Sequence, residues 1–301
     1  MNNNIETLLN KKYPQLLEQI KSQINNSEKD YCEKNSQSFG GSLWEHTYNV
    51  ASIASQLSKL ESIDPINPVI AALFHDSGKF NDGKYHEDDT REEVYAVEVA
   101  KEILNNFQIT EEDKEEIYLA IDSLYNENNS EKSLTSKIIH DSDFLSKLGF
   151  LGISTLFTKN GIRGNNLHRF IKKSLSKELS YQNAATFTMQ TNSGKTIAEK
   201  KVKGSLKFFK NLLDELRESN IAFYKIEEIK LKDYEEIFEN NEIGEAKIYL
   251  VIPEICEKCG NSLKFDFKTE KGIKCQKLIS HITCNNCDYA NEISFCMPEL
   301  F

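Results

Sequence analysis

The stretch Ala72-Leu73-Phe74-His75-Asp76-Ser77-Gly78-Lys79 decides how the rest of this 301-residue chain is interpreted. An apolar run ends in a histidine beside an aspartate, and the glycine that follows favours the end of a helix. His75 and Asp76 offer an imidazole and a carboxylate to one metal ion, but two ligands do not fix a metal. We expect further ligands elsewhere, and His46 and Asp141, each in a helix-like stretch, are the candidates.

The composition favours a cytoplasmic globular protein of one large or two modest domains. The chain has 37 Lys and Arg against 47 Asp and Glu, a net charge of -10, which argues against a general nucleic-acid binder but allows a local basic groove. It has no run of 18 apolar residues and no secretory signal, so we expect no membrane partner. The seven cysteines fit metal ligands and free thiols better than disulfides.

The spacing of apolar residues predicts helices as far as residue 216, with nothing in that part that predicts a strand. Ser42, with Glu45 three residues later, is typical of a helix start and places His46 in the first turn. Pro68 suits the first position of the next helix, which Gly78 ends. The predicted helices cover residues 5–25, 43–60, 69–76, 94–107, 111–125, 133–147 and 197–216.

After residue 220 apolar and polar residues alternate, which predicts strands over 246–252, 263–268, 278–283 and 293–297. The predicted fold class is therefore mainly α, a helical bundle followed by a small β domain. We expect a helical domain over residues 1–220, a connecting segment over 221–249 and a β module over 250–301.

Two C-x-x-C pairs predict a zinc site in the β module. Cys256 and Cys259 are separated by 24 residues from Cys284 and Cys287. Such thiolate pairs are typical of structural tetrahedral zinc, and a domain of about 50 residues gains folding energy from the metal. The pattern therefore indicates a zinc ribbon rather than a redox dithiol. The other cysteines are expected to be buried or incidental thiols: Cys32, Cys275 and Cys296.

Three segments resemble the H…HD…D signature of the HD-domain metal-dependent phosphohydrolases. They are Leu43-Trp44-Glu45-His46-Thr47, Phe74-His75-Asp76-Ser77-Gly78-Lys79 and His140-Asp141-Ser142-Asp143-Phe144-Leu145. Residues 148–153 and 191–198 are similar to the glycine-containing helix and the start of the closing helix of that family. The resemblance covers about residues 40–217. It implies a helical bundle around a central metal and hydrolysis of a phosphate ester or anhydride.

The resemblance also implies roles for single residues. The family's metal ligands correspond to His46, His75, Asp76 and Asp141. Lys79 matches a lysine that often faces the substrate phosphate, although it also suits a helix C-terminus as a counter-charge to the dipole. Asp143 matches the second acidic residue of the last motif, and we expect it to support the ligands rather than to bind the metal.

Acid–base and substrate-binding residues are expected just after the His-Asp helix and in a later loop. Glu92 is the first choice for the acid–base residue and His86 the second. Arg163 and Arg169 lie in a loop rich in Gly and Asn, where they would grip phosphates or the base. For each of these four residues the alternative is a plain surface or salt-bridged side chain.

Departures from the family pattern predict a single metal. Dinuclear members add histidines on the next two helices, and the matching stretches here, 91–96 and 120–125, have none. A mixture of imidazole and carboxylate ligands suits Mn, Fe, Co, Ni or Zn better than Mg or Ca. The guanosine-tetraphosphate hydrolases carry Glu-Asp directly after His-Asp, where this chain has Ser77-Gly78. Single-metal members that act on nucleotides fit best.

The expected function is therefore metal-dependent hydrolysis of a phosphate ester or anhydride of a nucleotide. A first alternative is an HD-type nuclease in which the ribbon contacts DNA or RNA. The near-neutral charge balance of the ribbon equally allows a protein partner. A second alternative is a regulatory module that senses a nucleotide without hydrolysing it.

Overall fold

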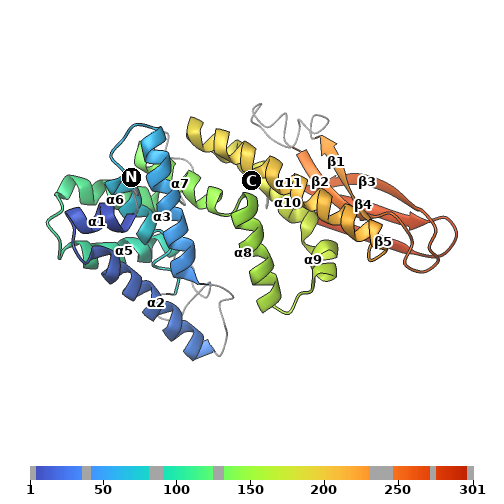
Figure 1. The fold of residues 1–301 in the computed structure, drawn as a ribbon, viewed down its shortest axis with the longest axis horizontal. Coiled ribbons are helices and arrows are strands. Elements are labelled where there is room, and N and C mark those ends of the chain that lie inside the picture. The colour runs from blue at the N-terminus through green and yellow to red at the C-terminus, as the bar shows by residue number, and fades with distance from the viewer. Residues whose placement is uncertain are drawn as a thin grey trace. The chain divides into compact units, whose positions relative to one another are not determined.

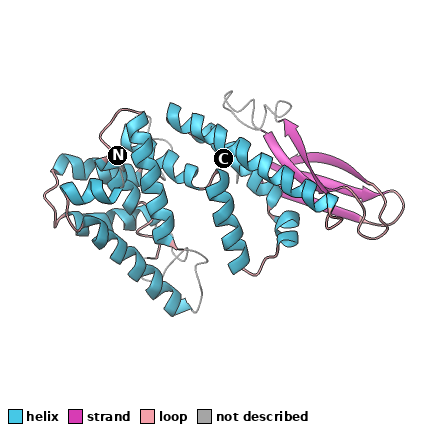
Figure 2. Cartoon of the chain, viewed as in Figure 1, coloured by secondary structure: helices cyan, strands magenta, loops and turns pink. Residues whose placement is uncertain are grey.

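A computed structural model describes residues 5–35, 42–80, 91–124, 132–230, 247–271 and 276–296. Helices precede strands, as Figure 1 and Figure 2 show, which confirms the predicted mainly α fold with a small C-terminal β part. The helices are α1 (Ile5–Lys12), α2 (Leu16–Asn35), α3 (Leu43–Leu60), α4 (Ile66–Phe74), α5 (Glu92–Leu104), α6 (Glu111–Asp122), α7 (Leu134–Ser146), α8 (Gly149–Ile162), α9 (Leu167–Lys173), α10 (Leu175–Thr188) and α11 (Asn192–Glu218). The strands are β1 (Tyr224–Lys230), β2 (Lys247–Pro253), β3 (Leu263–Lys271), β4 (Gln276–Cys284) and β5 (Ala290–Cys296). No helix within these residues is both long enough and apolar enough to cross a bilayer.

The chain forms two compact units. The division between them does not fall near residue 220, where the sequence predicts the boundary. The first unit consists of Met1–Lys147, Ser154–Lys159 and Met189–Ile197. The second consists of Leu148–Ile153, Asn160–Thr188 and Ala198–Phe301. Helices α9, α10 and most of α11 therefore belong with the strands.

Hydrogen bonds between α10 and β2 explain why these helices join the β part. β1 and β2 form an antiparallel two-stranded sheet, in which Tyr224 lies opposite Pro253. The hydroxyl of Ser180 accepts a hydrogen bond from the N–H of Tyr249 (2.9 Å), and that of Ser176 accepts one from Val251 (2.8 Å). The two serine hydroxyls thus satisfy N–H groups on the edge of β2, which would otherwise be open to pairing with a further strand. β3, β4 and β5 form a separate antiparallel sheet in that order.

The first unit is built around α4, which packs against α3, α6 and α7. Every residue from Val69 to Phe74 is fully buried, because this helix is apolar on all sides. α4 begins at Ile66, three residues before the predicted start, and Pro68 lies in its first turn. An N–H has no intrahelical partner there, so proline is tolerated.

The helix predicted over residues 5–25 is two helices in the structure. α1 ends at Lys12, and the backbone of Gln15 has a φ of 71°, which no helical residue adopts. Pro14 contributes to this break, because the residue before a proline is disfavoured in the helical conformation. α2 then continues to Asn35, beyond the predicted end.

Candidate metal centres

Two histidines from different helices face each other in the first unit. His46 lies in the first turn of α3, which begins where the Ser42 side chain accepts a hydrogen bond from the N–H of Glu45 (3.2 Å). His75 is the C-cap residue of α4. Their ring centroids are 5.4 Å apart. The predicted helix start before His46 is therefore confirmed, and it places this imidazole beside the end of the buried helix.

The Nε2 atom of His75 offers a lone pair to the space between the helices. The Nδ1 atom lies 2.7 Å from the carbonyl oxygen of Ala72, and a carbonyl only accepts, so Nδ1 carries the proton. His75 is only 4% exposed, and this burial lowers the pKa of its imidazole despite the nearby carboxylates. The ring is thus neutral with Nε2 deprotonated, which is the state that binds a metal.

Two carboxylates complete the cluster. Asp76 has Oδ2 3.5 Å from His46 Nε2 and Oδ1 3.6 Å from His75 Nε2. Asp143, on α7, has Oδ1 3.2 Å from His46 Nε2 and 3.9 Å from His75 Nε2. Burial raises the pKa of both carboxyls, but the imidazoles together with Lys79 beside Asp76 and Lys147 beside Asp143 outweigh burial and hold both pKa values low. Both groups are therefore anionic.

This donor set fits a divalent transition metal. Ligands about 2.1 Å from a common ion lie roughly 3 to 4 Å from one another, which matches the distances within the cluster. The ligand atoms of His46, His75 and Asp143 all lie within 4.8 Å of one another. His75 Nε2 and Asp143 Oδ1 are buried and receive no hydrogen bond from any residue that the structure describes. Buried polar atoms without a partner are costly, so their convergence indicates a cation.

Asp141, predicted as the last metal ligand, is bonded to a different part of the first unit, and Asp143 replaces it at the cluster. The carboxylate of Asp141 is fully buried and accepts hydrogen bonds from the N–H groups of Gln190 and Thr191, both 2.8 Å long. It also accepts one from the hydroxyl of Thr191 (2.7 Å). Only one of these two aspartates can face the histidines, because residues two apart project about 200° apart around α7.

Lys79 and Glu92 lie at the edge of the cluster. Lys79 Nζ is 3.2 Å from Asp76 Oδ2 and 3.8 Å from Glu92 Oε2. Gly78 allows this arrangement, because a Cβ at that position would lie only 2.4 Å from the carbonyl oxygen of Glu92 and 2.5 Å from the nitrogen of Ala96. The start of α5 is therefore held against the turn that follows His75.

The other predicted active-site residues belong to the second unit or lie outside the described residues. His86 belongs to residues 81–90, which the structure does not describe. Arg163 and Arg169 are exposed residues of the second unit. Their role in substrate binding remains a prediction.

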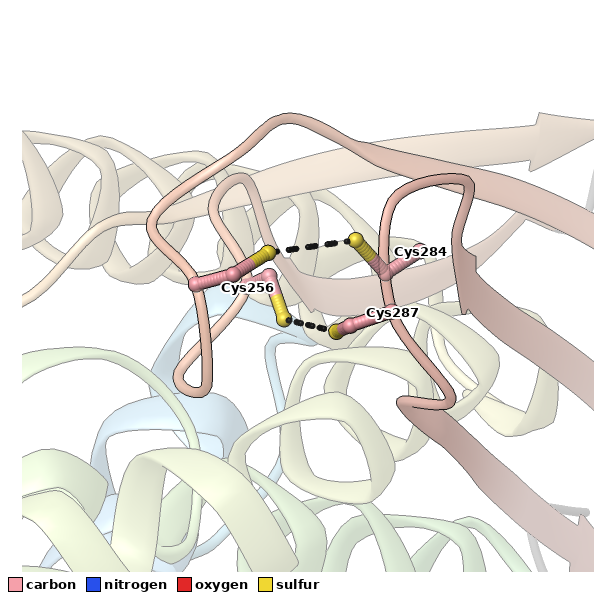
Figure 3. A group of neighbouring side chains, drawn as sticks. Cys256, Cys284 and Cys287 are labelled. Carbon is pink, nitrogen blue, oxygen red and sulfur yellow. Dashed lines mark hydrogen bonds between the residues drawn. The ribbon is translucent and has the colours of Figure 1, made fainter.

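The second candidate metal centre is formed by the four predicted cysteines. Sγ of Cys256 lies 3.5 Å from Sγ of Cys287, and Sγ of Cys259 lies 3.5 Å from Sγ of Cys284. All four sulfurs lie within 4.8 Å of one another, and Figure 3 shows two cysteine loops that face each other. Four thiols at this separation match the ligand spacing of a tetrahedral zinc site.

Each cysteine loop is held by backbone hydrogen bonds that orient its sulfurs. The N–H of Gly260 donates to the carbonyl oxygen of Cys256 (2.8 Å), and the φ of 72° at Gly260 needs a residue without a Cβ. The backbone and side chain of Asn261 lower the pKa of the Cys259 thiol to about 6. Cys259 therefore offers a thiolate, the form that binds zinc.

The remaining cysteines are not members of this cluster or have side chains outside the described residues. Cys32 is a half-buried free thiol on α2 in the first unit. Cys275 lies outside the described residues, and for Cys296 only its place in β5 is described. The expectation that both are buried thiols stays a prediction.

Comparison with known families supports the first centre. Residues 43–148 match the HD domain family, and this matched segment contains His46, His75, Asp76 and Asp143. This match confirms the predicted HD domain over these residues. No curated protein matches the chain in sequence.

Several solved structures are similar to the chain at low sequence identity. A predicted HD superfamily hydrolase from an uncultured Thermotogales bacterium is 22% identical with a TM-score of 0.47, and the match covers 66% of this chain and 92% of that one. Bacillus subtilis YpgQ in complex with ADP is 20% identical with a TM-score of 0.45, over 65% of this chain and 97% of that one. An HD-superfamily hydrolase from Bacillus thuringiensis is 22% identical with a TM-score of 0.46, over 67% and 98%.

Proposed function

We propose that this protein hydrolyses a phosphate ester or anhydride of a nucleotide with one divalent transition metal, held by His46, His75, Asp76 and Asp143. The observation that carries the proposal is the pair of buried atoms His75 Nε2 and Asp143 Oδ1, which lie 3.9 Å apart and have no hydrogen-bond partner among the described residues. Imidazole and carboxylate donors together favour Mn, Fe, Co, Ni or Zn. A cation bound there supplies an acidified water and a positive charge for a phosphoryl oxygen.

The residues around the cluster support phosphate chemistry. Lys79 brings a positive charge next to Asp76, where it attracts a substrate phosphate and stabilises the charge that develops on it. Glu92, 3.8 Å from Lys79, offers a carboxylate for proton transfer to the leaving group. His86 stays the second choice for that role. Arg163 and Arg169 stay candidates for a grip on the nucleotide.

We also propose that the four-cysteine cluster holds a structural zinc ion in a zinc ribbon. The support is that the two predicted cysteine pairs come together in space. One pair lies in the loop before β3 and the other lies where β4 turns into β5, and all four sulfur atoms are within 4.8 Å of one another. Metal binding there would contribute folding free energy to the small sheet. A cytoplasmic location agrees with the use of cysteines as metal ligands rather than disulfides.

A hydrolysis screen tests the proposed activity. Nucleoside mono-, di- and triphosphates are incubated with the protein and Mn²⁺, Co²⁺, Ni²⁺ or Mg²⁺, and the release of phosphate and pyrophosphate is measured. We expect release that is lost in His75→Ala and retained in His168→Ala, a matched change of an exposed histidine in the second unit.

Two other outcomes would replace the proposal. Degradation of single-stranded DNA or RNA by the wild type but not by His75→Ala, without nucleotide hydrolysis, would assign a nuclease. Nucleotide binding by the metal-loaded protein without any turnover would assign a sensing module.

A further inference from the structure

Positive charge is concentrated in one stretch of this acidic chain. Residues 147–210 include 13 Lys and Arg but only 2 Asp and Glu, whereas the remaining residues include 24 and 45. The stretch therefore has a net charge of +11, and the rest of the chain has a net charge of -21. A separation of charge on this scale creates a local attraction for polyanions that the overall charge of -10 conceals.

Within the second unit, part of this charge forms a single row on α11, the long yellow helix of Figure 1. Lys200, Lys203, Lys207 and Lys210 follow one another at intervals of three, four and three residues, which places side chains on the same side of a helix. We call these four residues the lysine face. All four are exposed, and none makes an ion pair with a carboxylate among the residues that the structure describes.

The opposite side of α11 packs into the second unit and fixes the direction of the lysine face. Val202, Phe209 and Leu213 are buried, and the ring of Phe209 lies 6.1 Å from that of Phe170 on α9. On average these buried positions lie about 120° around the helix axis from the lysine positions. The lysine face is therefore held toward solvent by a packed core.

An exposed aromatic ring borders the lysine face. Phe150 on α8 is 66% exposed, and its ring lies 3.7 Å from where a Cβ of Gly204 would be. Gly204 lies four residues after Lys200 and three before Lys207, so its position on α11 adjoins theirs. Phe150 also contacts Phe208 edge-on, with ring centroids 6.5 Å apart, which holds the ring in place beside the lysines.

We propose that the lysine face and Phe150 form a binding surface for single-stranded nucleic acid. The four ammonium groups would contact successive phosphates over about 15 Å of helix. The ring of Phe150 would stack on a base, which is how proteins bind single strands without reading their sequence. This surface stands independently of the proposed hydrolase chemistry, because the lysine face and Phe150 all belong to the second unit.

Charge and packing favour nucleic acid over a lipid surface. A helix that lies on a membrane inserts its own apolar face between the headgroups. The apolar face of α11 is buried in the second unit, with Phe209 fully buried and Leu213 only 2% exposed. What the helix offers outward is a row of ammonium groups, which matches a chain of phosphates.

Fluorescence anisotropy with a labelled 20-nucleotide single strand, oligo(dT) or oligo(U), tests the proposal. The full-length variant K200E/K203E/K207E/K210E is compared with the wild type from 50 to 200 mM NaCl. We expect affinity to fall at least tenfold, and the slope of log K against log salt to become shallower by roughly 2 to 3. The matched control reverses four exposed lysines of the first unit: K11E/K29E/K34E/K59E. It has the same net charge and should lose less than threefold.

A second variant separates stacking from charge. Phe150→Ala should weaken binding to the single strand by roughly fivefold and binding to a duplex of the same length much less, because a paired base does not offer its face. Circular dichroism confirms that each variant keeps its helix content, and a denaturing gel confirms that the oligonucleotide stays intact. Wild-type protein that does not bind the strand would overturn the proposal. Equal losses in the lysine-face variant and the control, or binding to phosphatidylserine vesicles in place of the strand, would also overturn it.

Discussion

The hydroxyl of Thr191 donates a hydrogen bond of 2.7 Å to the fully buried carboxylate of Asp141. The same hydroxyl accepts a hydrogen bond of 2.9 Å from the N–H of Gly194. Thr191 thereby joins α7, which carries Asp141, to the start of α11. Because the carboxylate of Asp141 is occupied by this joint, the neighbouring Asp143 is the aspartate of α7 that faces the histidines.

We expect Asp141→Asn to destabilise the protein without removing the metal site. The amide keeps one acceptor but directs an NH₂ group toward N–H donors, so we expect a loss of roughly 2 to 4 kcal/mol in the free energy of unfolding. Urea unfolding measures this loss, and titration of the folded variant with Co²⁺ or Mn²⁺ should give wild-type affinity. Unchanged stability together with lost metal binding would restore Asp141 as a ligand.

Glu61→Gln is the matched control for that substitution. Glu61 also accepts a hydrogen bond from the start of α11, from the N–H of Ser193 at 3.0 Å, but its side chain is only half-buried. Water replaces what the glutamine loses, so the free energy of unfolding should fall by less than about 1 kcal/mol. A loss as large as that of Asp141→Asn would mean that any carboxylate that accepts a hydrogen bond at this helix start contributes equally to the free energy of unfolding, whether or not it is buried.

Asp143→Asn is expected to weaken metal binding and to leave the stability of the protein nearly unchanged, the reverse of Asp141→Asn. The substitution removes a charged oxygen that lies 3.2 Å from His46 Nε2, so the affinity for Mn²⁺ or Co²⁺ should fall at least tenfold, a change of about 1.4 kcal/mol or more. Stability of the metal-free protein should change by less than about 1 kcal/mol. Calorimetric metal titration and urea unfolding check both expectations. Wild-type metal affinity in this variant would contradict the assignment of Asp143.

Local sequence patterns were sufficient for most of the helical unit and for three of the four clustered residues. The apolar run before His75 makes α4 buried on all sides, and Ser42 sets the start of α3, so two histidines and Asp76 were predictable from short stretches. The choice between Asp141 and Asp143 was not. It depends on Thr191, fifty residues later along the chain, and no local pattern reports that contact.

The boundary between the two units was also not predictable, because it depends on contacts between residues far apart in the sequence. β1 was not predicted, although β2 to β5 were, and β1 becomes a strand through its pairing with β2. The bonds from Val251 and Tyr249 to Ser176 and Ser180 tie α10 to the sheet. Serines on a helix carry no sign of such a role, so composition alone placed α10 with the helical domain.

Glycine-to-alanine substitutions on α11 test how tightly Asp141 is enclosed. A Cβ at Gly194 would lie 2.2 Å from Asp141 Oδ2, so Gly194→Ala must displace the carboxylate and should cost more than about 2 kcal/mol of stability. Gly204→Ala in the same helix meets only the Phe150 ring at 3.7 Å, and alanine favours a helix interior, so stability should be unchanged or rise by up to about 1 kcal/mol. Urea unfolding of both variants provides the comparison. Equal costs would mean that α11 tolerates no side chain at either glycine.

Removal of one cysteine ligand should release zinc and loosen only the small sheet. Cys256→Ser leaves three thiols within reach of the ion, and the serine hydroxyl is a poor ligand, so the zinc content per chain should fall by about one. The first unit has its own buried core around α4, so the helical circular dichroism signal should persist. Cys32→Ser is the matched control, because this thiol lies on α2 in the first unit and should leave the zinc content unchanged. Metal analysis that finds the same zinc content in both variants would disprove the four-cysteine site, and a collapse of the helical signal in Cys256→Ser would show that the two units do not fold independently.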